Sequence, residues 1–259
     1  MPIIRPTATT APVFFPEGEY VIVKYMDFTK FISLLSTQSL FFCRVDKLED
    51  QFEGTLSEPT VHLIRQFFEP AEQDDVVQDQ TSIDENINDV MKMQNKFKTT
   101  NCVNCWNIYE NNESAALWKI YSDFSKGIMI KSSIRKLIAA LETTEENIGL
   151  SEIQYIDHRK DQMGRIGNLM ESFNYKYISY SYEKEIRLIY DVTRSHASEF
   201  DWSKEEIQEG LYLKTDINQL IDEIIISPHS PKWFLCLVQD ICEKYKLEKN
   251  IKRSDLAPN

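Results

Sequence analysis

Two glutamates and an arginine at alternate positions form the part of this sequence best suited to chemistry. Within the segment 175–191, strand alternation predicts that Glu183, Glu185 and Arg187 share one face, with neighbouring side chains about 6 to 7 Å apart. Such a carboxylate pair can stabilise a cationic transition state and accept a proton. Tyrosines at 175, 177, 180 and 182 would shape a cleft around it. The alternative interpretation is a solvated outer face with an ion pair along the strand.

Three residues on two earlier segments could contact an anion. The β-branched run 20–25 predicts a strand that carries Lys24 and Tyr25. A second strand is predicted over 40–45, and Arg44 stands in line with its apolar residues. Because an arginine in an apolar row must be paired or must bind an anion, Arg44 is a candidate anion contact.

Several common catalytic motifs are missing from the sequence. There is no phosphate-binding loop, dinucleotide-binding glycine pattern, nucleophile elbow or H-E-x-x-H. Cys102 and Cys105 have a C-x-x-C spacing, but an offset of three on a strand points them to opposite faces, so we expect no metal. The alternative, a metal-dependent hydrolase, would gather carboxylates from four positions: Asp50, Glu53, Glu183 and Glu185.

Composition limits the classes of partner. The 259 residues carry a formal net charge of −12, which argues against a groove built mainly to neutralise phosphates. No apolar run approaches the roughly eighteen residues of a membrane span, and no signal peptide is recognisable. Five cysteines without secreted-scaffold spacing are typical of a reduced, cytoplasmic protein.

The elements that must position these residues predict an α+β fold. We expect residues 20–259 to form a single domain, with a mixed central β-sheet of about six to eight strands flanked by helices. Apolar stripes of helical period predict four helices, at 28–36, 113–122, 133–141 and 231–246.

Two segments are expected to lie outside this core. Residues 1–19 hold four prolines and no periodicity, which predicts a flexible leader. The region at about 60–98 is predicted to be an acidic helical insertion, because eight acids and no base lie between Glu69 and Asp89. An acidic run of this kind is usually a solvated face, and the alternative is a lid that docks a basic partner.

Four blocks of sequence resemble a known bacterial family. The stretch 101–131 reads C-W-N, N-x-E-S, L-W-x-x-Y and K-G-I-x-I in order, and it resembles the central block of the bacterial domain of unknown function 2971 family. The matching flanks are Leu40 to Gly54, Tyr182 to Arg187 and Leu220 to Trp233.

A second resemblance concerns the order of the charged residues. A basic residue on the first strand and a late E-x-E are similar to the ADP-ribosyltransferase superfamily, and the fold would then be ADP-ribosyltransferase-like. The resemblance implies NAD as a substrate, Glu185 as the catalytic residue and Glu183 as its helper. Lys24, Tyr25 and Arg44 would hold the dinucleotide. Loss of nicotinamide leaves an oxocarbenium-like sugar, which a carboxylate stabilises.

The implied function is an NAD-dependent ADP-ribosyltransferase or NAD glycohydrolase in bacterial conflict, as a toxin or in phage defence. The acceptor would be a protein or a nucleic acid, no membrane is involved, and a neutralising or regulatory protein partner is expected. The alternative to an enzyme is a non-catalytic ligand- or protein-binding module with three aromatic anchors: Trp106, Trp118 and Tyr121. Their simpler interpretation is core packing.

Overall fold

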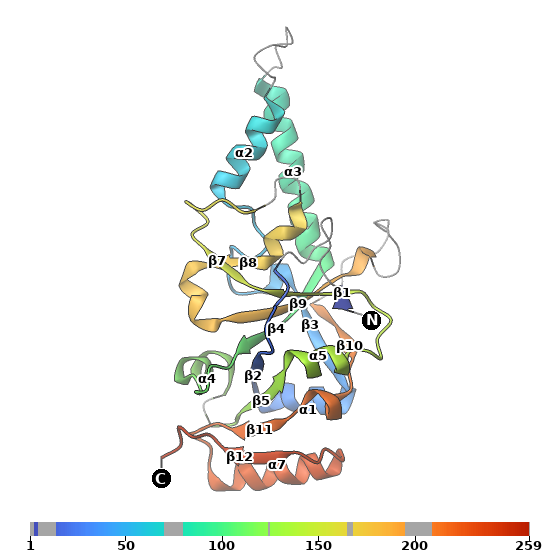
Figure 1. Cartoon of the computed structure of the whole chain (residues 1–259), viewed down its shortest axis with the longest axis vertical. Helices are drawn as coiled ribbons and strands as arrows, with labels where there is room; N and C mark the ends of the chain where they lie inside the picture. The colour runs from blue at the N-terminus through green and yellow to red at the C-terminus, as the bar shows by residue number, and fades with distance from the viewer. Residues whose placement is uncertain are drawn as a thin grey trace.

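A ten-stranded mixed sheet forms the centre of the computed structural model, which describes residues 3–4, 14–69, 80–123, 125–164, 168–194 and 209–258 (Figure 1). Eight strands follow the order β1-β6-β9-β4-β2-β5-β11-β12, and β3 and β10 form a branch from β4. The α+β prediction with a mixed central sheet is therefore confirmed. The predicted strand number of six to eight was too low, because short edge strands leave little periodic signal.

The strands of the main sheet are β1 Ile3–Ile4, β2 Val21–Asp27, β3 Ser39–Arg44, β4 Asn101–Ile108, β5 Gly127–Ser133, β6 Ile148–Glu152, β9 Glu185–Asp191, β10 Gly210–Lys214, β11 Glu223–Ile226 and β12 Asn250–Arg253. A separate two-stranded sheet pairs β7 Gln154–Ile156 with β8 Tyr175–Tyr177. β1 lies within the segment 1–19 that was expected to be a flexible leader. It pairs with β6, and Ile3 is buried in the core, so this part of the expectation differs from the structure.

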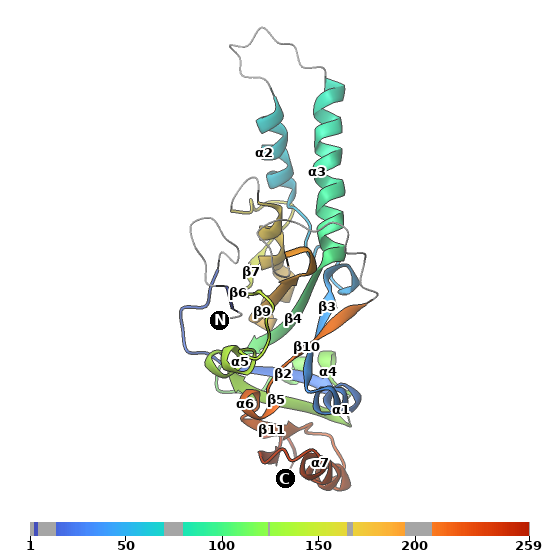
Figure 2. The same cartoon turned by 90° about the vertical axis from the view of Figure 1, so that its right-hand side faces the viewer.

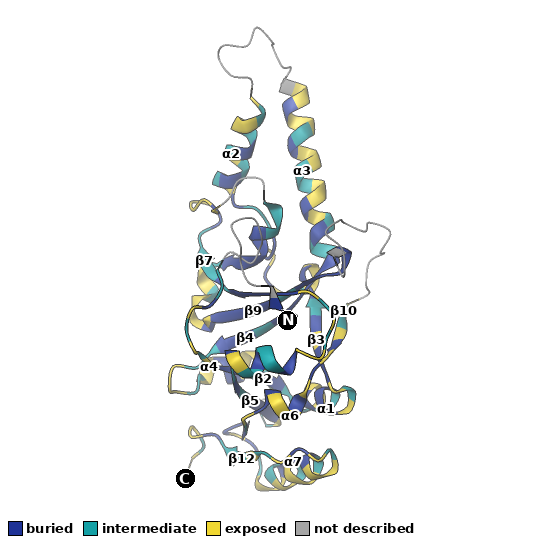
Figure 3. Ribbon diagram, turned by 45° about the vertical axis from the view of Figure 1, so that its right-hand side comes forward, coloured by how far each residue is buried: buried dark blue, intermediate teal, exposed yellow. Residues whose placement is uncertain are grey.

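One face of the sheet carries the main hydrophobic core. Four helices cover it: α1 Phe28–Thr37, α5 Ile134–Ala140, α6 Ile217–Leu220 and α7 Lys232–Lys244. From β9, this core receives Ile186, Leu188 and Tyr190, which point to the same side as Trp106 of β4. Figure 3 shows the central strands as buried and the outer surface of α7 as exposed.

The opposite face is covered by shorter elements. They are α4 Ala115–Tyr121, the end of α3, the β7–β8 pair and the 3₁₀ segments η1 Val45–Lys47, η2 Leu169–Asn174, η3 Ile178–Glu183 and η4 Val192–Arg194. Two small apolar clusters lie on this face. One packs α4 through Trp118, and the other packs α3 through Phe97. Between the two clusters, β9 places Glu185 and Arg187.

A helical hairpin projects from the body of the molecule. It consists of α2 Glu58–Phe68 and α3 Gln80–Thr100, and both views show it standing away from the sheet (Figures 1 and 2). Ile64, Ile83 and Ile87 are buried in the hairpin, whereas Phe67 is 78% exposed. The helices of the expected 60–98 segment are thus present, while residues 70–79, which hold four of the eight acids, lie outside the described residues.

The four predicted helices correspond to α1, α4, α5 and α7, with shifted ends. The start of α4 and the end of α7 each shift by two residues, and in α4 the side chain of Ser114 caps the helix by accepting from the backbone N–H of Leu117. Within the described part of the chain, none of the helices has the length and hydropathy needed to cross a membrane.

Candidate active site

The two glutamates meet at the junction between η3 and β9. Glu183 is the last residue of η3, Lys184 adopts a left-handed conformation with φ of 47°, and Glu185 begins the strand. The prediction that a strand begins at Glu183 is therefore wrong. The left-handed residue turns the chain so that both carboxylates still point into the same cluster, which also contains Lys176 of β8.

Arg187 lies at the centre of this cluster and is fully buried. Its guanidinium donates to both carboxylate oxygens of Glu53 at 2.8 and 3.0 Å, and to Oε1 of Glu185 at 2.7 Å. It also donates to the backbone carbonyl of Phe173 at 2.9 Å. A bidentate pair of this geometry fixes the orientation of both partners. The expected ion pair along the strand exists, but it is buried rather than solvated.

Lys176 brings three carboxylates together. Its Nζ donates to Oε2 of Glu183 at 2.5 Å and to Oε2 of Glu185 at 3.1 Å, and it lies 3.6 Å from Oε1 of Glu53. The ammonium also lies over the ring of Tyr180, 4.9 Å from the centroid. Three carboxylates therefore share two cations, Lys176 and Arg187, and the cluster has a net negative charge when all five groups are ionised. No pattern in the sequence indicated Lys176, because its partners are seven or more residues away and lie on other elements.

The loop before α2 positions Glu53. The Asp50 side chain accepts from the N–H of Phe52 at 3.0 Å, and Glu53 donates its N–H to the Asp50 carbonyl. Gly54 follows with φ of +64°, and a Cβ there would lie 2.6 Å from the ring of Phe173. A glycine is thus required at the position that turns the chain after Glu53.

Burial and neighbouring charges separate the pKa values of the two glutamates. Burial alone would raise the pKa of Glu185, but Arg187 and Lys176 outweigh it and lower this pKa to about 2. Burial raises the pKa of Glu183, and the ammonium of Lys176 opposes that shift only in part. For Lys176, burial acts to lower the pKa, and the carboxylates of Glu185 and Glu53 raise it above its ordinary value. Glu185 therefore stays ionised, and Glu183 takes up a proton more readily.

Glu183 is the carboxylate closest to exposed side chains. The hydroxyl of Tyr121, on α4, donates to its Oε1 at 2.5 Å, and Tyr121 is 38% exposed. The neighbouring Tyr182 is 44% exposed. By contrast, the two oxygens of Glu185 face Arg187 and Lys176, which are both buried. Glu183 and Glu185 are each 2% exposed, but Glu183 adjoins partly exposed tyrosines, whereas Glu185 adjoins two buried cations.

Lys24 lies within electrostatic reach of Glu185, whereas Tyr25 packs against α4, and both are already engaged. Because β2 and β3 pair with different ends of the same edge of β4, the middle of that edge is left open. There, Lys24 donates to the carbonyl of Cys105 at 2.6 Å, and burial lowers the pKa of its ammonium. The hydroxyl of Tyr25 accepts from the N–H of Ser114, and its ring packs edge-on against Trp118. Tyr25 thus supports the start of α4.

Arg44 is separated from the carboxylate pair. It pairs in register with Cys102 of β4, whereas Glu185 pairs with Asn107. Because these two partners are five positions apart on a continuous strand, and an odd offset reverses the face, the two side chains leave opposite faces of the sheet. Arg44 instead donates to both oxygens of Asp46, at 2.5 and 2.8 Å. This placement corrects the expectation that Arg44 and Glu185 share a site.

The carboxylates of the metal alternative gather around a lysine. Glu53, Glu183 and Glu185 converge on Lys176, and Asp50 caps the preceding loop instead. Within the described residues, no group of three or more histidine, cysteine, aspartate or glutamate side chains is arranged to hold a metal ion.

The aromatic anchors of the binding-module alternative belong mostly to the core. Trp106 is fully buried, and Trp118 is 4% exposed, as core packing requires. Of the three, Tyr121 alone is substantially exposed, and its hydroxyl is bonded to Glu183. The sequence had predicted Tyr121 to be buried, because it shares a helical stripe with Leu117.

No family model matches this chain, and no curated protein matches it. Among solved structures, DarT of Thermus sp. 2.9 in complex with NAD+ matches with a TM-score of 0.40 and 10% identity, covering 94% of this chain and 100% of that chain. The same protein in complex with ADP-ribosylated ssDNA gives a TM-score of 0.38 and 12% identity, covering 94% and 97%. Its complex with carba-NAD+ gives a TM-score of 0.37 and 10% identity, covering 93% of this chain and 98% of that chain. Likeness of this degree establishes neither the activity nor the substrate of this chain.

Proposed function

We propose that this protein cleaves the bond between ribose and nicotinamide in NAD+ and transfers the ADP-ribose to an acceptor or to water. One observation carries the proposal: a carboxylate with a raised pKa, Glu183, is held by a buried lysine beneath partly exposed tyrosines. A negative charge at this position suits a reaction in which positive charge develops on a sugar. The E-x-E order of elements and the resemblance to ADP-ribosyltransferases support the same chemistry.

The proposed reaction assigns different roles to the two glutamates. The C–N bond between the ribose and nicotinamide breaks, and its electron pair leaves with nicotinamide, which departs neutral. Glu183 stabilises the resulting oxocarbenium-like sugar. An acceptor hydroxyl, amine or water then forms the new bond to the ribose and gives its proton to Glu183. Glu185 pairs with Arg187 and Lys176, and Lys176 holds Glu183 in position. The sequence had predicted the reverse assignment, with Glu185 as the reacting group.

Nicotinamide release measures this reaction directly. The wild-type chain should release nicotinamide from NAD+, with water, single-stranded DNA or a protein mixture offered as acceptor. Glu183→Gln keeps the shape and removes the charge, so the rate should fall by about 10²- to 10³-fold. Glu145→Gln is the matched control, because Glu145 is exposed and lies 38 residues before Glu183 in the sequence, and this variant should keep the wild-type rate. A wild-type chain that never releases nicotinamide would end the proposal, as would a fully active Glu183→Gln.

The remaining expectations from the two resemblances are part of this proposal. They are membership of the domain of unknown function 2971 family, a cytoplasmic location, a function in bacterial conflict or defence, and a neutralising or regulatory protein partner. Lys24, a predicted cofactor contact, lies within electrostatic reach of Glu185, and its ammonium would have to leave the carbonyl of Cys105 to contact the dinucleotide.

A further inference from the structure

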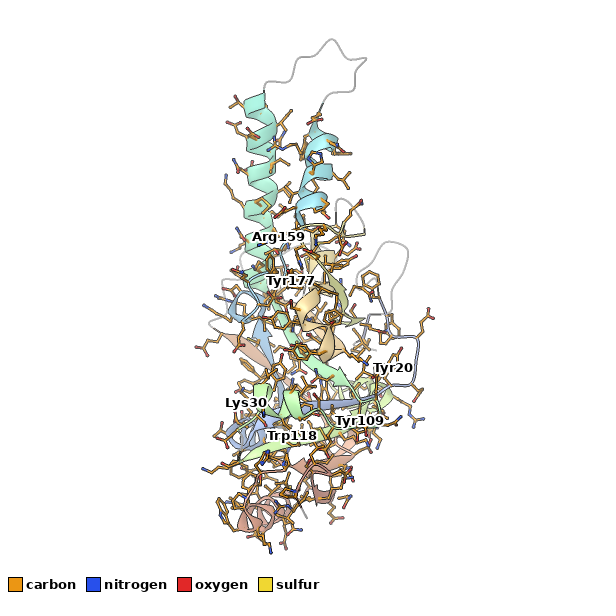
Figure 4. All side chains as sticks on the ribbon, turned by 90° about the vertical axis from the view of Figure 1, so that its left-hand side faces the viewer. Tyr20, Lys30, Tyr109, Trp118, Arg159 and Tyr177 are labelled. Carbon is orange, nitrogen blue, oxygen red and sulfur yellow. The ribbon has the colours of Figure 1, made fainter. Side chains whose placement is uncertain are left out.

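A second site adjoins the carboxylate cluster. A pocket of about 460 Å³ lies at the start of β9, where Glu185 forms part of its wall. Tyr155 joins the pocket to the cluster, because it lines the pocket and its hydroxyl accepts from the N–H of Glu185 at 2.8 Å. Tyr20 is distant from Tyr155 in the sequence but lines the same pocket. Figure 4 shows Tyr20 at one side of the body.

Four polar side chains in this wall are unused. The hydroxyls of Tyr20 and Ser181, the carboxylate of Glu152 and the amide of Gln154 make no hydrogen bond or ion pair with other described residues. Elsewhere in the site, by contrast, each carboxylate and each cation is engaged. These groups are exposed or half-buried, so a ligand can reach them, and a few convergent polar groups in one pocket are typical of a ligand site.

The charge of the pocket selects the chemistry of its ligand. Lys184, on the rim, is ion-paired with Glu110, so these two charges cancel. The carboxylate of Glu185 points away to Arg187 and Lys176. Glu152 is therefore the one charge of the wall without a partner among the described residues. It is half-buried, where a carboxylate gains more from a cation than it does at an open surface.

We propose that this pocket binds the cationic side chain of a protein acceptor, with Glu152 pairing the guanidinium or ammonium group. The rings of Tyr20 and Tyr155 would cover its aliphatic stem, and Gln154 and Ser181 would accept its remaining N–H donors. A phosphate backbone does not fit, because the unpaired carboxylate of Glu152 would repel it and the whole chain carries a net charge of −12. This inference rests on the proposed function for its biological role, and it names a protein rather than a nucleic acid as the acceptor.

Calorimetric titration with agmatine, without NAD+, tests the pocket apart from any reaction. We expect saturable one-to-one binding that Glu152→Gln weakens by about tenfold or more. Glu145→Gln is the control for loss of one negative charge at an exposed position, and it should bind agmatine as the wild type does. Thermal unfolding of each variant would establish that the fold is intact.

Three results would overturn the inference. They are the absence of saturable agmatine binding, equal binding by Glu152→Gln, and displacement of agmatine by a single-stranded oligothymidylate. The two proposals can fail separately. A chain that binds agmatine but never releases nicotinamide would support the cation-binding pocket and contradict the proposed reaction. A chain that releases nicotinamide but does not bind agmatine would support the proposed reaction and contradict the cation-binding pocket.

Discussion

The two faces of β9 pack in different ways. On one face, Ile186 and Leu188 lie in the main core under four helices. On the other face, Glu185 and Arg187 lie in a network of charges that short elements cover. Both faces are fully buried, but on the first any apolar side chain of suitable volume would serve, whereas on the second each group needs a specific partner. The charged face is therefore the one whose stability depends on particular pairs of residues.

Replacing Arg187, the central cation of the charged face, should cause the largest loss of stability. Arg187→Met leaves Glu53 and Glu185 buried without their main partner, and we expect a loss of about 3 to 5 kcal/mol in the free energy of unfolding. Denaturant titration with a circular-dichroism readout measures it. Adding Glu53→Gln and Glu185→Gln to the same chain should recover part of the loss. A triple variant as unstable as the single one would show that Arg187 acts through packing instead.

The apolar face should respond to a cavity alone. Leu188→Ala is expected to cost about 2 to 5 kcal/mol, because the site lies in a close-packed core. Its loss should be the same at pH 7 and pH 4, as no titrating group is involved. The same pair of denaturant titrations tests this, and a loss that changed with pH would couple the two faces of the sheet.

Acid should weaken the charged face specifically. The pKa of Glu185 is lowered to about 2 in the folded chain, against about 4.3 for an unperturbed glutamate, so the folded state binds fewer protons in this range. The resulting stabilisation is complete above the unfolded pKa and is lost as the pH falls towards 2; it amounts to at most about 3 kcal/mol. Glu185→Gln should flatten this part of the stability–pH curve. If Glu185→Gln loses stability with falling pH as the wild type does, other carboxylates cause that loss.

The smallest expected effect concerns the residue between the two glutamates. Lys184 has φ of 47°, a conformation that glycine adopts without strain. Lys184→Gly should therefore be more stable than Lys184→Ala by roughly 0.5 to 1 kcal/mol, since both variants lose the ion pair with Glu110. Melting temperatures of the two variants would measure the difference. Equal values would mean that the turn between the glutamates relaxes when Lys184 is replaced.

The apolar half of the fold could be predicted from sequence because its signal is periodic. The stripe of α1 and that of α7 each gave a helix within about two residues of its observed ends. The apolar stripe of α4 gave a wrong prediction of which residues are buried, because a helix of seven residues has too few turns to define a face. It buries Leu117 and Trp118 and leaves Ile120 and Tyr121 partly exposed.

The candidate site could be predicted only in part. Alternation along one segment grouped Glu183, Glu185 and Arg187, since these residues are close in the chain. Lys176 and Glu53 join them through tertiary packing, which no spacing in the sequence encodes. Arg44 misled for the opposite reason: its apolar row predicted burial correctly, but its partner, Asp46, lies two residues away in a turn.

The central claim is that one glutamate of the pair reacts and the other supports it. Carbon-13 NMR of labelled glutamate carboxylates tests this, with the two resonances assigned through Glu183→Gln and Glu185→Gln. The account predicts that Glu183 titrates above the ordinary range for glutamate and that its resonance shifts when NAD+ is added. Glu185 should stay ionised down to about pH 2, with little response to NAD+. Two carboxylates that titrate together, or an NAD+ response at Glu185 without one at Glu183, would contradict the account.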